Sequence, residues 1–345
     1  MRARAENRNL RLLAAAAALA LAALLAVAAA AEPRSRSVEL TYRALVRELP
    51  PGTGRIDVWL PYPHSDDVQE VEVVEVSWPY AKEIREQREL GNRILHLAAD
   101  HPARTEITVS MVVAVTRSEW IRKDFGRAHD HLQGQPAPAV ARWLAPDRLV
   151  PLDDRIRRLA QEVTAGKRTD LEKARAIYDY VVATMRYDKS GTGWGHGDIY
   201  WACDAKRGNC TDFHALFTGL ARAVGIPAKF EIGFPVPPER GAGKIGGYHC
   251  WSQFYLDGYG WVPVDASEAW KHQDKRDYFF GALDENRVKF SDGRDLVLDP
   301  PQHGPPLNYF VYPYVEVNGK PHAAVDLTVT YRDRPALAAA AGRAD

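Results

Sequence analysis

Alternating apolar residues predict a group of β-strands in the first third of the chain. The alternation is clearest over residues 38–46 and 107–115, where every second side chain is apolar, as expected for strands with one buried face. Shorter runs predict further strands at 56–60, 71–76 and 94–97. Several short strands in succession favour an N-terminal β-sandwich, which we place at residues 38–118.

The pattern then changes to a helical period. Residues 119–150 are interrupted by several prolines and are predicted to be a linker. After them, Thr169-Asp170-Leu171-Glu172 has the sequence of a capping box, and apolar residues follow it at helical spacing. A second helix is predicted to begin at or near Cys210, because apolar side chains recur on one face up to Val224. Gly225 and Pro227 are expected to end it.

Strands return in the second half of the chain. Residues 248–256 and 259–265 are rich in aromatic and β-branched side chains and flank Asp257-Gly258, which predicts a β-hairpin. The later strands are predicted at 309–317 and 325–331. The order of these elements predicts an α+β fold. Its proposed parts after the linker are a core at 151–300, a C-terminal β extension at 301–335 and a frayed tail at 336–345.

Composition narrows the class of protein. The apolar content of 46% is enough to bury sizeable cores. The 45 basic and 45 acidic residues give a formal net charge of zero, so there is no electrostatic case for a nucleic-acid partner.

The N-terminus has the pattern of an export signal. Several arginines precede an Ala/Leu-rich run from Leu12 to Ala31, and small residues stand just before Glu32. We therefore predict a cleaved signal peptide at residues 1–31 and a periplasmic or secreted protein. The alternative is an uncleaved N-terminal helix that anchors the chain in a membrane, because the run is near the minimum length for a span.

Three side chains in order along the chain are candidates for nucleophilic catalysis. Cys210 lies at the predicted start of a helix, where the macrodipole and free N–H groups favour an anionic sulfur. His249 and Asp265 lie on the two strands of the predicted hairpin, where a three-residue loop at 256–258 would place them directly opposite each other. A two-residue loop would shift that pairing by one residue. The three residues match a thiol nucleophile, its base and the carboxylate that orients the base.

The surrounding segments resemble the transglutaminase-like superfamily. They are GNCTDFHALFTGLARAVGIPA (208–228), GYHCWSQFY (247–255) and GYGWVPVDASEA (258–269). The resemblance implies a papain-like core in which Cys210 is the nucleophile, His249 the general base and acid, and Asp265 the orienting group. The superfamily also includes members without activity, so it indicates chemistry better than substrate. No equivalent of a calcium loop is present in the sequence, and no cofactor is expected.

Other residues near the motifs carry weaker signals. Superfamily members often use an aromatic side chain upstream of the cysteine as a second oxyanion donor, and the candidates here are Tyr187, Trp194 and Trp201; aromatic packing is the alternative role for each. His214 is expected to pack or to form a hydrogen bond. His196 and Asp198 are only two candidate metal ligands. Two ligands are a weak signal, so no metal site is predicted.

The cysteine count raises the question of a disulfide. Three cysteines in an oxidising compartment leave one odd thiol. If Cys210 is the nucleophile, Cys203 and Cys250 are the remaining pair, and geometry decides whether they form a bridge. Side-chain alternation places Cys250 on the opposite face of its strand from His249, so Cys250 is not expected to be the nucleophile.

These observations predict an exported cysteine enzyme that cleaves or transfers an acyl group through a thioester. Hydrolysis is favoured over transfer to an amine. The expected substrate is a protein, a peptide or a cell-envelope polymer. The alternative is an inactive module that binds a peptide or envelope polymer in the same cleft. A lone cysteine before an apolar helix is usually a packing residue, so the catalytic reading depends on all three side chains together.

Overall fold

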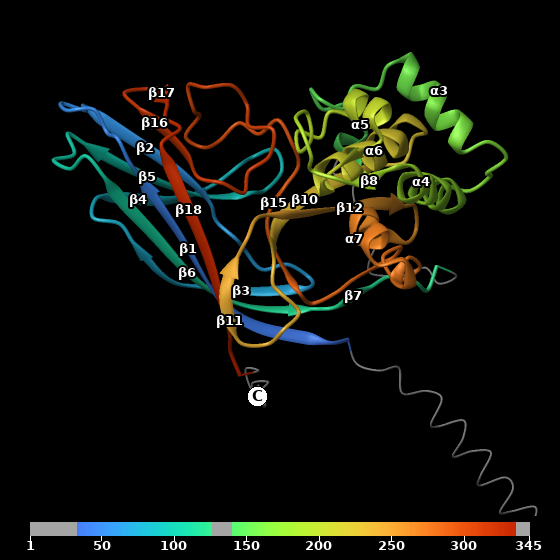
Figure 1. The fold of residues 1–345 in the computed structure, drawn as a ribbon, viewed down its shortest axis with the longest axis horizontal. Coiled ribbons are helices and arrows are strands. Elements are labelled where there is room, and N and C mark those ends of the chain that lie inside the picture. Colours follow the sequence, from blue (N-terminus) through green and yellow to red (C-terminus); the bar gives the residue numbers. More distant parts are fainter. Residues whose placement is uncertain (1–32, 126–139, 336–345) are drawn as a thin grey trace, which may run out of the picture. The chain divides into compact units, whose positions relative to one another are not determined.

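The computed structural model describes residues 33–125 and 140–335 (Figure 1). The predicted signal peptide, part of the predicted linker and the predicted frayed tail lie outside these residues. Within the described ranges, no helix is long and apolar enough to cross a membrane. The predicted α+β fold class is confirmed: strands β1–β7 form an N-terminal β-sheet region, and a core of helices and strands follows it.

Two five-stranded antiparallel sheets form the N-terminal part. In spatial order, the first contains β11 (Ala242–Ile245), β18 (Val325–Asp333), β1 (Ser35–Val46), β6 (Ile107–Ser118) and β3 (Gln69–Ser77). The second contains β17 (Lys320–Pro321), β16 (Tyr314–Val317), β2 (Arg55–Pro61), β5 (Arg93–Asp100) and β4 (Ala81–Glu86). Apolar residues of both sheets, including Leu40 and Val58, belong to one buried cluster. The alternating pattern therefore reflects one face of each sheet packed into a shared core.

The C-terminal strands complete these sheets. Strand β18 pairs with β1 along its whole length, from Val325↔Val46 to Asp333↔Val38, and Figure 1 shows these two strands side by side. Strand β16 pairs with β2. Residues assigned to a C-terminal extension thus supply strands to the N-terminal sheets.

Strand β4 was not predicted from the sequence. Only Ile84 is an aliphatic residue of any size within it, and its side chains are mostly exposed. It lies at the edge of its sheet and is defined by pairing with β5. An edge strand with two polar faces has no alternating signal to detect.

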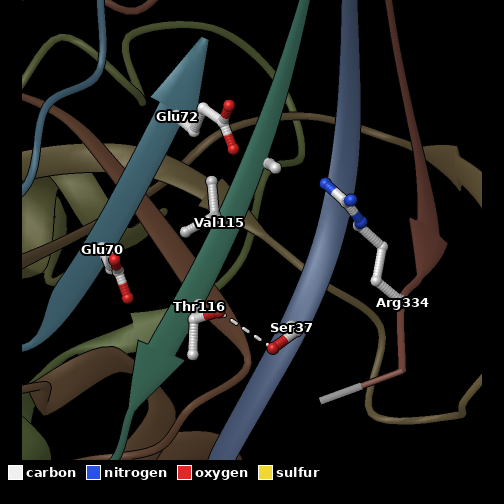
Figure 2. A pocket seen from close by; sticks show the side chains of 7 residues that line it. Ser37, Glu70, Glu72, Val115, Thr116 and Arg334 are labelled. Carbon is white, nitrogen blue, oxygen red and sulfur yellow. Dashed lines mark hydrogen bonds between the residues drawn. The ribbon is translucent and has the colours of Figure 1, made fainter. Parts of the chain in front are cut away.

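The outer face of the first sheet carries a small hollow of about 40 Å³ (Figure 2). It lies over β1, β3 and β6, with Glu70 and Glu72 on one side and Arg334 on the other. The hydroxyls of Ser37 and Thr116 lie 2.9 Å apart and bond to each other. This hollow contains none of the predicted catalytic residues.

The core combines helices with a four-stranded sheet. Its helices are α3 (Asp154–Val163), α4 (Asp170–Thr184), α5 (Ile199–Ala205), α6 (Cys210–Ala223) and α7 (Ala266–Lys271). The sheet order is β13 (Gly260–Val264), β12 (His249–Leu256), β10 (Ala228–Pro235) and β15 (Arg287–Asp292). Short pairs join β8 (Arg186–Tyr187) to β9 (Arg207–Gly208), and β7 (Trp120–Ile121) to β14 (Ala282–Leu283). Single 3-10 turns occupy Arg142–Leu144 and Gln273–Lys275.

The two predicted helices form for the expected reasons. Helix α4 begins with the capping box of Thr169 and Glu172. Helix α6 ends just before Gly225, which has the positive φ of 84° expected after a helix C-terminus. Phe217 of α6 contacts Phe254 of β12, with ring centroids 6.2 Å apart. Helix α6 therefore covers one face of the core sheet.

The opposite face of the core sheet is polar, and we call it the polar face. Because side chains alternate along a strand, it carries His249, Trp251 and Gln253 from β12. The other strands add Lys229 and Glu231 from β10, Trp261 from β13, and Arg287 and Lys289 from β15. The indole N–H of Trp251 donates to Glu231, and the guanidinium of Arg287 lies 5.0 Å from the Trp251 ring centroid. Charged groups in this layer are thus arranged in contact with one another.

Candidate active site

Cys210 is the first residue of α6, and a second capping box fixes this position. Asn209 is the N-cap: its Oδ1 accepts from the backbone N–H of Thr211 at 2.9 Å. In return Asp212 Oδ2 accepts from the backbone N–H of Asn209 at 2.9 Å. The thiol is therefore held where free helical N–H groups and the macrodipole favour negative charge.

Asp212 also organises the loop beside the cysteine. Its buried carboxylate accepts from Gly195 N at 2.7 Å and from Gly197 N at 3.0 Å. Gly208 passes directly beside this carboxylate, since a Cβ at that position would lie 2.1 Å from Asp212 Oδ2. Only glycine permits this approach. The role of Asp212 was not predicted from the sequence.

His249 and Asp265 form a direct, buried hydrogen bond. His249 Nε2 donates to Asp265 Oδ2 at 2.7 Å, and the two residues are 5% and 0% exposed. Asp265 is held from its other oxygen, where Oδ1 accepts from Glu268 N at 2.9 Å and from Ser267 Oγ at 3.0 Å. The carboxylate thus also serves as the N-cap of α7.

The contact between His249 and Asp265 arises from a different register than the one predicted. Strands β12 and β13 pair Leu256 with Gly260 and Ser252 with Val264, so the loop comprises residues 257–259. The predicted direct opposition of His249 and Asp265 is therefore wrong, and so is the alternative two-residue loop. Asp265 follows the end of β13 and turns into α7, which brings its side chain back towards His249.

The thiol of Cys210 completes the group through side-chain hydrogen bonds with His249 and Cys250. Because Asp265 occupies Nε2 of His249, Nδ1 is the nitrogen left for the thiol. Burial raises the pKa of Cys210, but these two hydrogen bonds and the positive charge of His249 outweigh it, so the pKa lies well below its ordinary value.

The base carries the complementary shift. Burial lowers the pKa of His249, yet the charge and hydrogen bond of Asp265, together with Cys210, raise it to about 10. Burial alone would raise the pKa of Asp265, but the charged His249 holds it well below the usual range. The site therefore favours a thiolate–imidazolium pair supported by an ionised carboxylate.

His214 joins the two halves of the site. Its Nδ1 donates to the backbone oxygen of Cys210 at 2.8 Å, and its Nε2 accepts from Ala266 N at 3.2 Å. These two bonds require a neutral ring protonated on Nδ1, which agrees with a pKa lowered by burial. The short distance of 3.7 Å from Nε2 to Asp265 Oδ1 is therefore not an ion pair. His214 fixes the start of α6 relative to the start of α7.

Arg287 is a further component that the sequence analysis missed. Its Nη1 donates to Asp265 Oδ2 at 2.9 Å, the same oxygen that accepts from His249. The side chain is 2% exposed and also pairs with Asp284. Arg287 is not part of a local sequence motif, because it lies 22 residues after Asp265 and reaches the site from another strand. A buried cation here keeps the carboxylate ionised.

The three oxyanion candidates have different surroundings. Tyr187 on β8 pairs with Gly208, two residues before the nucleophile. Burial and then the negative charge of Cys210 raise the pKa of its phenol. The indole N–H of Trp194 donates to the backbone oxygen of Gly191 at 3.1 Å. The Trp201 indole packs against Gly193. Among the three candidates, Tyr187 is the one on a strand paired directly with the segment before Cys210.

The cysteine pair suggested by counting is not formed. All three cysteines are free. Cys250 lies on the α6 side of β12, where its sulfur is 3.8 Å from both Thr211 Oγ1 and His214 Nδ1 and bonds with Cys210. Its pKa is raised well above the ordinary value by burial and by Cys210. Strand alternation, which directs Cys250 towards α6, decides its neighbours.

His196 and Asp198 have structural contacts. The Asp198 carboxylate accepts from Tyr200 N and Trp201 N at the start of α5. The backbone oxygen of His196 accepts from Arg294 at 2.8 Å. In the described part of the chain, no three His, Cys, Asp or Glu side chains gather as a metal site would require.

A groove of about 340 Å³ opens beside His249. Its apolar lining includes residues 235–238 and Ile245. Acidic and basic residues, among them Glu268 and His272, also line it. The predicted loop at 235–247 therefore borders the cleft, and its last part forms strand β11.

We expect Cys210 to react with iodoacetamide at a nearly constant rate between about pH 7 and pH 9. Its lowered pKa supplies the thiolate, and His249 keeps its proton up to about pH 10. Cys203 is the internal control, because burial raises its pKa to about 11. Its labelling should rise about tenfold per pH unit. Peptide mapping by mass spectrometry measures both rates; parallel profiles for the two cysteines would contradict the ion pair.

The chain is similar to several known proteins in sequence and fold. Residues 157–266 match the transglutaminase-like superfamily. The chain is 28% identical over 310 residues to an uncharacterised protein of Haemophilus influenzae, covering 79% of this chain and 84% of that one. A solved structure of a candidate cysteine protease from Cytophaga hutchinsonii is similar, with a TM-score of 0.59 and 16% identity over 88% of this chain and 93% of that chain. The periplasmic domain of TgpA from Pseudomonas aeruginosa is also similar, with a TM-score of 0.36 and 17% identity, over 72% and 91%.

Proposed function

We propose that the transglutaminase-like superfamily domain at residues 157–266 is the catalytic part of a cysteine hydrolase that cleaves amide bonds in protein or peptide substrates. The observation that carries the proposal is the contact sequence from Cys210 through His249 to Asp265, with the last two 2.7 Å apart. A nucleophile bonded to a base that is itself oriented by a carboxylate is the arrangement required for acyl transfer.

The proposed reaction has two halves. The Cys210 thiolate attacks the amide carbonyl carbon, and the carbonyl π electrons move to oxygen, giving an oxyanion. The oxyanion collapses, the carbon–nitrogen bond breaks, and His249 gives its proton to the leaving amine. Water then attacks the thioester while His249 takes one of its protons. Breaking the carbon–sulfur bond releases the acid and restores the thiolate and imidazolium.

The oxyanion has two proposed donors. One is the backbone N–H of Cys210, at the N-terminus of α6, where helical N–H groups have no intrahelical acceptor. The other is the Tyr187 phenol, which stays protonated because burial and the nearby thiolate raise its pKa. Both donors lie on elements next to the nucleophile rather than on a distant loop.

Location and substrate are part of the same proposal. The N-terminal run that resembles a signal peptide supports export of the enzyme to the periplasm or the medium. Substrates would then be exported proteins, peptides or cell-envelope polymers, and the groove beside His249 would receive them. N-terminal sequencing of the protein from its native compartment tests export; retention of Met1 would contradict cleavage.

We expect water rather than an amine to resolve the thioester. The groove beside His249 is open and partly charged, so it does not exclude water as transfer to an amine requires. The test incubates the protein with a peptide library and a labelled primary amine at millimolar concentration, and mass spectrometry counts free acids and amine adducts. An excess of free acids supports hydrolysis. An excess of adducts would make the protein a transamidating enzyme, and no product of either kind would favour a binding module.

A further inference from the structure

A second pocket lies at the other end of the polar face of the core sheet, next to the end of β6. It has a volume of about 100 Å³. Its lining comes from the β2–β3 connection (Asp66, Asp67, Val68), from β6 and β7 (Arg117, Trp120) and from the core sheet (Lys229, Glu231, Gln253, Trp261, Lys289). It shares no lining residue with the groove beside His249. The pocket is therefore a separate place for a ligand.

Arg117 in this pocket is buried without a hydrogen-bond partner. The residue is 2% exposed, and neither its Nε nor its Nη2 bonds to any atom in the part of the chain that the structure describes. Burying an ionised group without partners is costly. Native structures seldom leave such a group unsatisfied, unless a bound water, ion or ligand completes it.

The two unsatisfied nitrogens of Arg117 lie along the same edge of the guanidinium. Their N–H groups point in parallel, so this edge can donate two hydrogen bonds to the two oxygens of one anion. A carboxylate matches this edge, because its two oxygens accept the two parallel bonds and its charge compensates that of the guanidinium. The free edge is therefore suited to an oxyanion.

The acidic groups around Arg117 are held by other cations. Lys289 Nζ lies 3.0 Å from Asp66, 3.4 Å from Asp292 and 3.7 Å from Glu231. Lys229 Nζ lies 3.5 Å from Glu231. Glu231 also accepts from the side chains of Trp251 and Gln253. The charges of Asp66 and Glu231 act on Arg117, but no hydrogen bond joins its Nε or Nη2 to a carboxylate among the described residues. These two nitrogens are therefore left for a group from outside the chain.

Gln253 supplies a second unsatisfied group in the same pocket. Its Nε2 donates to Glu231, which fixes the orientation of the amide. Its Oε1 is buried and accepts no hydrogen bond from the described residues. A ligand that bonds to Arg117 through an anion and to Gln253 through an N–H or O–H would satisfy both groups.

We propose that this pocket binds a small carboxylate that also carries a hydrogen-bond donor, the class that includes α-amino acids and α-hydroxy acids. The ligand carboxylate would accept hydrogen bonds from Nε and Nη2 of Arg117, and the ligand amine or hydroxyl would donate to Oε1 of Gln253. Trp120 and Trp261 supply apolar surface for the rest of the ligand. A phosphate fits less well, because its second charge would face Asp66, Asp67 and Glu231, while the two lysines of the lining, Lys229 and Lys289, are already paired with acidic groups.

This site does not depend on the proposed catalysis. The catalytic thiol lies at the start of α6, which covers the opposite face of the core sheet. Ligand binding can therefore be measured on protein in which Cys210 has been alkylated or replaced. Failure of the hydrolase proposal would leave this inference standing, and the reverse also holds.

The experiment measures binding of four probes to the full chain by isothermal titration calorimetry: glycine, lactate, acetate and inorganic phosphate. We expect glycine and lactate to bind with dissociation constants on the order of millimolar, as small ligands of few atoms do. Acetate lacks the donor and should bind at least about threefold more weakly. Phosphate should bind more weakly than glycine.

Two substitutions test the role of Arg117. Arg117→Lys keeps the positive charge but loses the two parallel N–H donors of the guanidinium, so it should weaken glycine binding at least about tenfold. Arg117→Met should abolish it. Circular dichroism and thermal unfolding check that each variant is folded, and the Arg85→Met variant, on the exposed strand β4, is the matched control. Absence of saturable binding of glycine and lactate to the parent, parent-like binding in Arg117→Met, or tighter binding of phosphate than of glycine would each overturn the proposal.

Discussion

Cys210→Ala protein is expected to fold like the parent and to lose turnover by about 10⁴-fold or more, because the substitution removes the nucleophile. The buried site loses only one sulfur atom, and α6 keeps its cap, since Asn209 and Asp212 bond through other groups. Release of free acid from the peptide substrates found by library mapping measures the effect.

Cys203→Ala is the matched control for this loss. Cys203 is half-buried on α5, and its pKa of about 11 makes it a poor nucleophile at neutral pH. Its replacement should leave turnover unchanged within about twofold, because Cys203 forms none of the hydrogen bonds around Cys210, His249 and Asp265. Folded Cys210→Ala protein that keeps parental turnover would exclude the thioester mechanism.

Arg287→Met is expected to destabilise the fold by about 3–5 kcal/mol, the cost typical of breaking a buried ion pair by removing one partner. Arg287 is 2% exposed and lies 2.9 Å from the fully buried Asp265. Methionine replaces much of its volume, so the loss reports on charge rather than on a cavity. The free energy of unfolding from denaturant titration measures the change.

Arg85→Met is the control for a salt bridge at the surface. Arg85 pairs with Glu83 at 2.7 Å, but the two side chains are 47% and 42% exposed. Water already solvates both charges, so the denaturant midpoint should not change. Equal midpoints for Arg287→Met and the parent would show that Asp265 does not need the guanidinium to remain ionised.

The Asp265 contact explains why Arg287 should also affect the chemistry. Asp265 Oδ2 accepts from both His249 and Arg287. Burial would raise the pKa of Asp265, and the charge of Arg287, after that of His249, lowers it. Arg287 therefore helps to keep ionised the oxygen that supports the imidazolium.

The sequence predicted the elements and the chemical groups because both depend on near neighbours. The two-residue period of 38–46 and 107–115 predicted strands, and the helical period after Cys210 predicted α6 with its thiol at the N-terminus. The order of Cys210, His249 and Asp265 predicted which side chains meet. The second capping box, formed by Asn209 and Asp212, was not predicted, although the two residues have the three-residue spacing of that motif.

The partners that the site depends on were decided by tertiary structure. The loop between β12 and β13 comprises residues 257–259 rather than the predicted 256–258, and this shift changes the pairing of the two strands. Asp265 reaches His249 because the chain turns from β13 into α7 at this residue. Cys250 lies by Cys210 rather than in a bridge with Cys203, because the face of its strand is set by the whole core sheet.

By itself, then, the sequence determined where most of the strands and helices occur and that Cys210 begins a helix, since periodicity and capping act over two to four residues. Only the tertiary structure decided that β18 pairs with β1, that Arg287 holds Asp265, and that Arg117 is buried with an unused edge. Each of these depends on segments far apart in the chain, and a single charged residue in a strand carries no signal of the residue it will face.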